Sequence, residues 1–162
     1  MHVDFYYDFV SPYSFFASLR LGGFRPPLGA KVNWVPVRLV RLLELSDNVS
    51  PVTVPKKARY MLRDLKRWGL RFGVPFSMQH PPFFDTEAAL VSALALTGEE
   101  RERYSAAVFL ALWTGQVAPA DGADWVDRAL KLARLPSSWA RPERCSSACS
   151  AGRSCRRRSA LG

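Results

Sequence analysis

Cysteine is absent from the chain until position 145, and the three that it has are Cys145, Cys149 and Cys155. Their spacings come without the histidine partners of a zinc site, so we expect no metal there. The chain also lacks a phosphate-binding P-loop and a dinucleotide-binding glycine fingerprint. These absences argue against the metalloproteins and nucleotide-binding enzymes that are easiest to recognise from sequence.

Long apolar runs are absent as well, and none approaches the roughly 20 residues of a transmembrane helix. The N-terminus has no basic region followed by an apolar stretch, so we predict no secretory signal. We therefore expect a cytoplasmic protein without a membrane span. A length of 162 residues is typical of one domain with enough residues to bury a core.

The net charge of +9 comes largely from the end of the chain, where residues 141–162 carry six arginines against one glutamate. This segment has almost no large apolar side chain, so we predict a disordered basic tail. The preceding residues are only modestly basic, which argues against a specific nucleic-acid partner. One alternative stays open, a non-catalytic remnant or binding module whose tail contacts nucleic acid or acidic lipid.

The most informative stretch begins at residue 3. Val3, Phe5 and Tyr7 alternate with other residues in an aromatic-rich run over residues 3–8, which predicts a strand. Ser11 then precedes Pro12, as an N-cap precedes a proline at the first helical position. Such a helix start offers free N–H groups and a partial positive charge to an anion, although a serine in a lone Ser-Pro pair more often serves as a cap alone.

The remaining pattern is a second strand over residues 31–36, followed by helices. We predict the helices at about 55–72, 87–96, 99–114 and 121–134, with a short helical or irregular segment at 37–45. The candidates for the apolar side of the 55–72 helix are Tyr60, Leu62, Leu65, Trp68 and Leu70.

Residues 3–135 resemble the 2-hydroxychromene-2-carboxylate isomerases and the kappa-class glutathione transferases, which are relatives of the disulfide oxidoreductase DsbA. The resemblance rests on the Ser-Pro-Tyr-Ser sequence at residues 11–14, on residues 48–68, and on the Phe-Phe-Asp-Thr-Glu-Ala run at 83–88. It implies an α/β, thioredoxin-like fold of the DsbA/kappa type, with a β-α-β start and an all-α insertion. Redox relatives have Cys-x-x-Cys where this chain has residues 11–14, so disulfide exchange by this motif is excluded.

The resemblance also implies site residues and a cofactor, glutathione. Ser11 would be the catalytic residue, with its hydroxyl donating a hydrogen bond to the glutathione sulfur. The implied glutathione-binding residues are Pro12, Tyr13, Asn48 and Lys57, and the candidate walls for an aromatic substrate are Trp34, Phe83 and Phe84.

The family's C-terminal β-β-α half, which completes the sheet and the glutathione site, has no counterpart after residue 136. We expect an incomplete thioredoxin-like domain over 1–140, with its helical insertion at about 54–135, and attribute the missing half to a truncation or frameshift. An uncovered sheet edge would favour oligomerisation, for example a homodimer. The implied reaction is glutathione-dependent cis-trans isomerisation of a small aromatic-derived 2-oxo acid in aromatic catabolism. The alternatives are conjugation of glutathione to electrophiles and an inactive remnant.

Overall fold

The computed structural model describes residues 2–23, 31–78, 82–119 and 124–136. The chain begins with strand β1 (His2–Tyr7), helix α1 (Pro12–Gly23) and strand β2 (Lys31–Pro36). The helices that follow are α2 (Leu39–Leu45), the 3-10 turn η1 (Pro51–Thr53), α3 (Pro55–Phe72), α4 (Glu87–Ala95), α5 (Gly98–Trp113) and α6 (Trp125–Leu132). The tail predicted over residues 141–162 lies outside the described residues.

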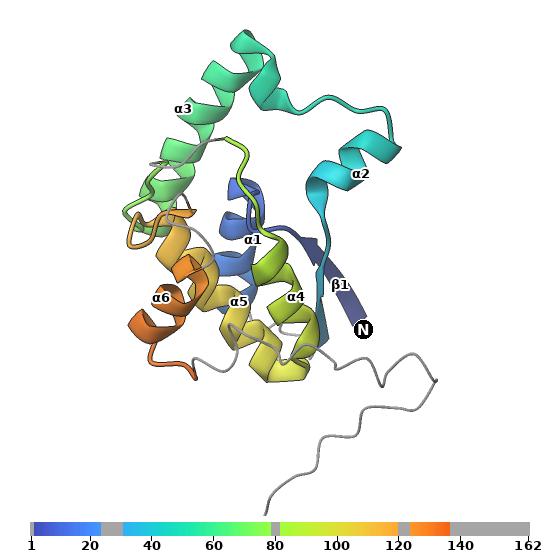
Figure 1. Cartoon of the computed structure of the whole chain (residues 1–162). Helices are drawn as coiled ribbons and strands as arrows, with labels where there is room; N and C mark the ends of the chain where they lie inside the picture. Colours follow the sequence, from blue (N-terminus) through green and yellow to red (C-terminus); the bar gives the residue numbers. More distant parts are fainter. Residues whose placement is uncertain (1, 24–30, 79–81, 120–123, 137–162) are drawn as a thin grey trace, which may run out of the picture.

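Strands β1 and β2 form a parallel pair in which Phe5 lies opposite Trp34. Both strands were predicted to within a residue, and the β-α-β order is confirmed. One face of the pair is buried, and there the rings of Phe5 and Trp34 meet edge to face at 5.0 Å. On the other face Tyr6 is exposed, and Asn33 Nδ2 donates to Asp4 Oδ1 at 3.0 Å. The described residues contain no third strand. In Figure 1 the helices lie on one side of the strand pair.

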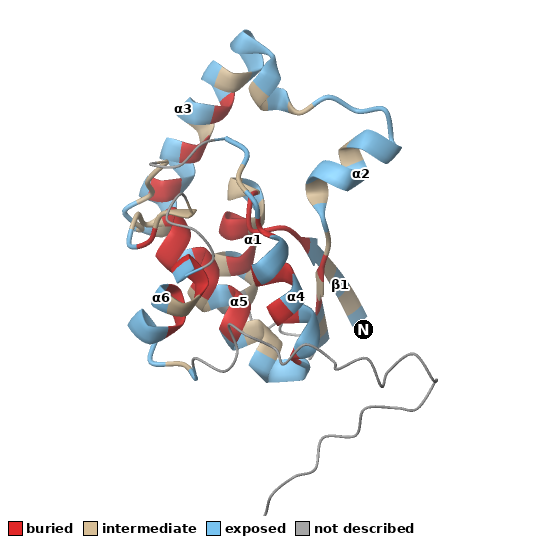
Figure 2. Cartoon of the chain, in the orientation of Figure 1, coloured by how far each residue is buried: buried red, intermediate tan, exposed pale blue. Residues whose placement is uncertain are grey.

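The core lies where α5 meets α1 and the carboxyl end of β1, and Figure 2 shows buried residues gathered on these elements. Its centre is aromatic, with the rings of Phe9 and Phe109 4.9 Å apart. Trp113 of α5 donates from its indole Nε1 to the carbonyl of Phe9 at 3.1 Å. A buried indole N–H needs such a partner, and this bond ties α5 to the segment that leads into α1.

Helix α3 has the predicted bounds but turns a different side inward. Its buried residues are Met61, Leu65 and Gly69, which follow one another at i, i+4 and i+8. Tyr60, Leu62 and Trp68 are exposed, and Leu70 is 85% exposed, so the predicted apolar side is wrong at these positions and right at Leu65 alone.

The later helices match the prediction in order, with shorter bounds for the last one. Helix α6 occupies Trp125–Leu132 rather than the predicted 121–134. Among the described residues, none of the helices combines the length and the apolar composition that crossing a bilayer requires.

Candidate functional site

Ser11 is the N-cap residue of the first helix, as the sequence predicts. Its carbonyl accepts the N–H of Phe15 at 3.1 Å, which is the first bond of α1, and its Oγ accepts the N–H of Ser14 at 3.2 Å. The hydroxyl that accepts this bond still carries a proton that it can donate outward. Ser11 is partly exposed, so an approaching anion would meet both this O–H and the partial positive charge of the helix end.

Asp8 fixes the turn that places Ser11. Its side chain is 2% exposed, its Oδ1 accepts the N–H of Val10 at 3.2 Å and the hydroxyl of Thr86 at 2.7 Å, and its Oδ2 accepts the N–H of Leu39 at 2.8 Å. The Asp8 carbonyl also accepts the N–H of Ser11 at 3.0 Å. One buried carboxylate therefore joins the β1–α1 turn to the starts of α2 and α4.

In the sequence, Asp8 stands out only as one residue of the predicted strand. A signal was available, because an aspartate between aromatic residues at the end of a buried strand needs several hydrogen-bond donors once it is buried. Its donors, however, lie as far away in sequence as Thr86, and no local pattern names them.

A cavity of about 110 Å³ opens at Ser11. Its wall is mostly apolar and is built from the β1–α1 turn, α2, the η1 turn, α3, the segments flanking residues 79–81, and the end of α5. The lining residues are Val10, Ser11, Pro12, Tyr13, Leu39, Val40, Leu43, Ser50, Pro51, Val52, Met61, Met78, Pro82, Phe83 and Trp113. This volume is below the roughly 300 Å³ at which drug-sized ligand pockets begin. It therefore suits a small group such as a thiol, and the rest of a larger ligand would lie outside it.

Tyr13 lines this cavity and is held by a residue of α3. Its hydroxyl donates to Asp64 Oδ2 at 3.1 Å. Partial burial, together with this bond and the charge of Asp64, raises the pKa of Tyr13 to about 12. The phenol therefore remains a neutral donor at neutral pH, and the bond links the start of α1 to α3.

Asn48 and Lys57 are not among the residues that line the cavity at Ser11. Both are exposed, Asn48 in the loop after α2 and Lys57 in the first turn of α3. Asn48 Oδ1 accepts the N–H of Val49 at 2.8 Å, which is a local loop contact. The described structure thus leaves both side chains on the surface.

The three predicted substrate walls have different positions. Phe83 is exposed and lines the cavity at Ser11. Trp34 does not fit the prediction, because it is 4% exposed and packs in the core against Phe5 and Tyr7. Phe84 turns toward α6, where its ring meets that of Trp125 edge to face at 6.4 Å. Strand β2 carries Trp34 on the face that the helices cover, so its side chain packs in the core and does not line the cavity at Ser11.

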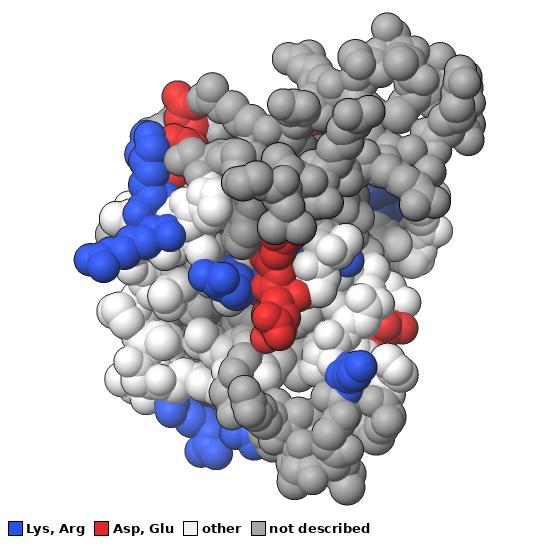
Figure 3. Space-filling view, turned by 90° about the horizontal axis from the view of Figure 1, so that it is seen from below, with Lys and Arg blue, Asp and Glu red and all other residues white. Residues whose placement is uncertain are grey.

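Among the described residues, no three His, Cys, Asp or Glu side chains are grouped closely enough to hold a metal ion. Charge on the face seen in Figure 3 is mixed, with Lys and Arg separated by uncharged surface and by a central group of Asp and Glu. Where its residues are described, that face presents no continuous basic patch of the kind that tracks a phosphate backbone.

Comparison with known proteins places the chain in a family. Residues 2–133 match the DSBA-like thioredoxin domain, and the chain belongs to this family. Its structure is similar to a solved structure of 2-hydroxychromene-2-carboxylate isomerase, with a TM-score of 0.72 and 26% identity, over 86% of this chain and 69% of that one. The predicted α/β, thioredoxin-like fold of the DsbA type is thereby confirmed.

Among curated proteins the chain is 27% identical to 2-hydroxychromene-2-carboxylate isomerase of Sphingobium xenophagum over 122 residues, and 30% identical to that of Pseudomonas putida over 123 residues. It is 26% identical to glutathione S-transferase kappa 1 of Caenorhabditis elegans over 136 residues. The matches cover 74%, 74% and 77% of this chain but 62%, 59% and 59% of the relatives. The resemblance to these two enzyme groups is confirmed, and the chain spans about three fifths of their length.

Proposed function

We propose that this chain carries the thiol-binding half of a glutathione-dependent isomerase that acts on an aromatic-derived 2-oxo acid of the 2-hydroxychromene-2-carboxylate type. The observation that carries the proposal is the position of the Ser11 hydroxyl, which lies at the N-terminus of α1 and lines a small, mostly apolar cavity. The names of the relatives supply the reaction class.

The cavity fits the reactive end of glutathione. A thiol with its methylene needs little space, and a volume of about 110 Å³ is sufficient for it. The peptide part would then extend along the surface toward Asn48 and Lys57, where an amide can pair with the peptide backbone and an ammonium with a carboxylate. When bound, glutathione supplies a thiolate that adds to a conjugated carbon and is later eliminated, so that rotation can occur about the former double bond.

The chain's own residues prepare the site for a thiolate. The Ser11 O–H donates toward the sulfur position, and the helix end stabilises the negative charge, which lowers the pKa of a thiol placed there. Asp8 holds the turn, and Tyr13 and Phe83 wall the opening. The mostly apolar lining limits the access of water, and poor hydration makes a thiolate a stronger nucleophile.

A second candidate is conjugation of glutathione to electrophiles, favoured by the 26% identity to a kappa-class transferase. Both reactions need the same thiolate, so the site cannot separate them. Product analysis does so: isomerisation of a chromene carboxylate regenerates free glutathione, whereas conjugation to a chlorinated arene consumes it.

The experiment that tests the site is calorimetric titration of glutathione into the full chain. We expect saturable binding that Ser11→Ala weakens about tenfold, the equivalent of one hydrogen bond to a charged group. Ser50→Ala is the matched control, because Ser50 lines the same cavity but does not lie at the N-terminus of α1. S-methylglutathione should bind at least as weakly as glutathione binds to the Ser11 variant, because a thioether carries no charge for the helix end to stabilise. Equal affinities for all the proteins, or no binding by a folded chain, would contradict the proposal.

A further inference from the structure

The outer side of α3 carries a row of basic side chains. Seven residues of this helix are Lys or Arg, and one, Asp64, is acidic. Lys56, Arg59, Arg63 and Arg67 follow one another at i, i+3, i+7 and i+11, so a period of 3.6 residues places them on one face. All four are exposed, and exposed residues continue along α3 in Figure 2. We call these four residues the basic stripe.

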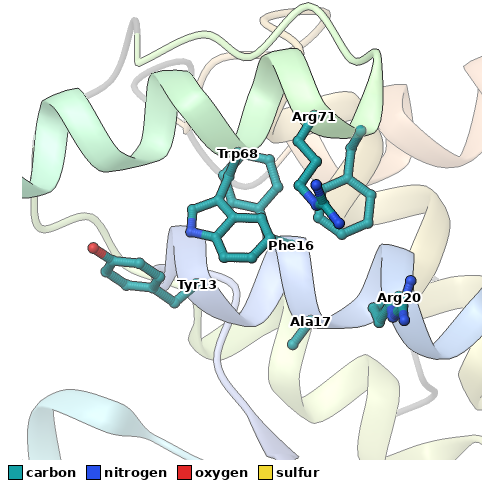
Figure 4. Close-up of a pocket in the computed structure, with 7 residues that line it drawn as sticks. Tyr13, Phe16, Ala17, Arg20, Trp68 and Arg71 are labelled. Atoms are coloured by element: carbon teal, nitrogen blue, oxygen red, sulfur yellow. The ribbon is translucent and has the colours of Figure 1, made fainter.

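The basic stripe lies opposite the side of α3 that packs on the rest of the protein. The buried residues Met61, Leu65 and Gly69 form the inner side. In Figure 4, Trp68 and Arg71 turn from α3 toward α1. None of the four stripe residues lines the cavity at Ser11. The stripe therefore points away from the proposed thiol site, and Lys57 is not part of it.

The charge of the basic stripe has no partner in an ion pair of the described residues, because those pairs lie on α2, α4 and α6. Asp64 is half-buried, and its Oδ2 accepts the hydroxyl of Tyr13 of α1 at 3.1 Å. Helix α3 packs mainly against α1 and η1, and neither contains an Asp or a Glu. The field at this surface therefore favours a partner with many negative charges.

Two large apolar side chains accompany the basic stripe. Leu70 continues the row at i+14 from Lys56 and is 85% exposed, and Tyr60 lies beside the row and is 65% exposed. At 1.5 Å per residue, the row from Lys56 to Leu70 is about 21 Å long. A leucine gains little beside a hydrated phosphate backbone, but it gains by leaving water for the boundary of a lipid layer. A lipid surface thus uses both parts of this face, whereas a nucleic acid uses only the cations.

We infer that the outer face of α3, which consists of the basic stripe, Tyr60 and Leu70, is a docking surface for a membrane that contains anionic lipid. The cations would pair with phosphate and carboxylate headgroups, while Leu70 and Tyr60 enter the interfacial layer. A straight row on a convex helix allows a flat surface to touch all four cations at once. A second copy of this chain is disfavoured as the occupant, because it would bring four cations against four.

The test is sedimentation of the full chain with lipid vesicles. We expect binding to vesicles of mixed phosphatidylcholine and phosphatidylserine, and none to phosphatidylcholine alone. The triple substitution Arg59→Gln, Arg63→Gln and Arg67→Gln should weaken binding about tenfold or more, because each basic residue near an anionic surface contributes to the attraction. The matched control removes the same charge from exposed positions of other elements, and it should change the affinity less than about twofold. Its substitutions are Lys31→Gln, Arg103→Gln and Arg134→Gln.

Two further variants separate charge from shape and from apolar contact. Replacing the same three arginines of the stripe by lysine should keep the affinity within about twofold, since attraction to headgroups depends on charge more than on a planar pair of donors. Leu70→Ser should weaken vesicle binding about threefold or more while leaving binding to a short DNA duplex unchanged. Circular dichroism shows whether each variant keeps the helical fold.

Several results would overturn the inference. They are an equal loss in the stripe and control variants, an unchanged affinity in Leu70→Ser, and no vesicle binding by a folded chain. Tighter binding of the duplex than of the vesicles, at equal concentrations of phosphate groups, would assign the stripe to nucleic acid instead. A loss confined to Arg156→Gln, Arg157→Gln and Arg158→Gln would assign the binding to the C-terminal arginines.

This inference does not depend on the proposed function. Saturating glutathione and the Ser11→Ala substitution should both leave vesicle binding unchanged, because the basic stripe lies on the other side of α3 from the cavity at Ser11. The stripe variants should in turn leave the glutathione titration unchanged. Failure of one proposal is therefore distinguishable from failure of the other.

Discussion

Thr86 and Asp8 are joined by a hydrogen bond of 2.7 Å, donated by Thr86 Oγ1 to Asp8 Oδ1, and both side chains are buried. Thr86 is the N-cap residue of α4, but its hydroxyl caps no backbone N–H of that helix. It serves the carboxylate at the end of β1 instead. The helical part of the chain is therefore fastened to the turn that carries Ser11.

We expect Thr86→Val to lower the free energy of unfolding by about 1–3 kcal/mol, because valine keeps the volume but leaves a buried carboxylate oxygen short of a donor. Urea denaturation followed by circular dichroism measures the loss. Thr97→Val is the control, since Thr97 is exposed at the N-cap of α5 without a side-chain capping bond, and its change should stay within about 0.5 kcal/mol. Equal effects of the two substitutions would show that the bond to Asp8 contributes nothing.

Elements with a local signal were predictable from the sequence. The alternation over residues 3–8 and the Ser-Pro pair at 11–12 indicate a strand and a capped helix, and both are present. The bonds of Asp8 were not predictable, because they come from residues brought together only by the fold.

The facing of α3 and the burial of Trp34 were missed for a related reason. An apolar residue on a helix or strand can face the core or the solvent, and its neighbours in space decide between the two. Leu70 is as apolar as a typical core residue, yet the buried face of α3 consists of Met61, Leu65 and Gly69, and Leu70 points to solvent.

The buried Tyr7 should make the free energy of unfolding depend on pH in the alkaline range. Burial raises its pKa to about 12, although a hydrogen bond of 2.6 Å with Ser105 acts in the opposite direction. A folded-state pKa above the unfolded value means that the contribution is fully present below about pH 10 and is lost as the pH rises toward 12.

We therefore expect the free energy of unfolding to fall between pH 10 and pH 12, and to fall less steeply in Tyr7→Phe. Urea melts at several pH values give the slopes, and ultraviolet absorbance of the phenolate follows ionisation of the tyrosines. Tyr6→Phe is the control, because Tyr6 is exposed on the neighbouring position of β1. Identical slopes for wild type and Tyr7→Phe would contradict the expectation.

Arg101 joins three elements through a single guanidinium group. Its Nε donates to the carbonyls of Ala93 and Leu96 at 2.9 and 3.0 Å, at the end of α4, and its Nη1 donates to the carbonyl of Trp34 at 3.0 Å. The last carbonyls of a helix have no partner within the helix, so this side chain satisfies them from outside.

Arg101→Lys should destabilise the fold by about 1–3 kcal/mol, since one ammonium cannot reach all three carbonyls and leaves acceptors unpaired. Arg103→Lys, at an exposed position of the same helix, should be close to neutral. Hydrogen exchange provides a second measure, because faster exchange in α4 and β2 is expected for Arg101→Lys alone. A neutral result at position 101 would mean that water replaces the guanidinium without cost.

The turn after α3 approaches that helix closely at Gly69. The N–H of Val74 donates to the carbonyl of Gly69 at 3.1 Å, and a Cβ placed on Gly69 would lie 2.9 Å from the Cβ of Phe76. A Cβ cannot move unless its backbone moves, so the 74–76 segment would have to shift and disturb the stacking of Phe76 on Trp113, whose centroids are 5.8 Å apart.

Two opposing effects therefore decide the outcome of Gly69→Ala. Alanine gains about 1 kcal/mol in helix propensity, whereas overpacking costs about 1–3 kcal/mol, so we expect a net loss measured by urea denaturation. Gly98→Ala provides a comparison without a contact, because a Cβ added at Gly98 would meet nothing within 4 Å and the φ of +52° alone imposes strain. The loss at position 98 should leave the tryptophan fluorescence of the folded chain unchanged, while the loss at position 69 should alter it through Trp113. An increase in stability for Gly69→Ala would mean that the turn yields freely and that glycine is not needed for the close approach.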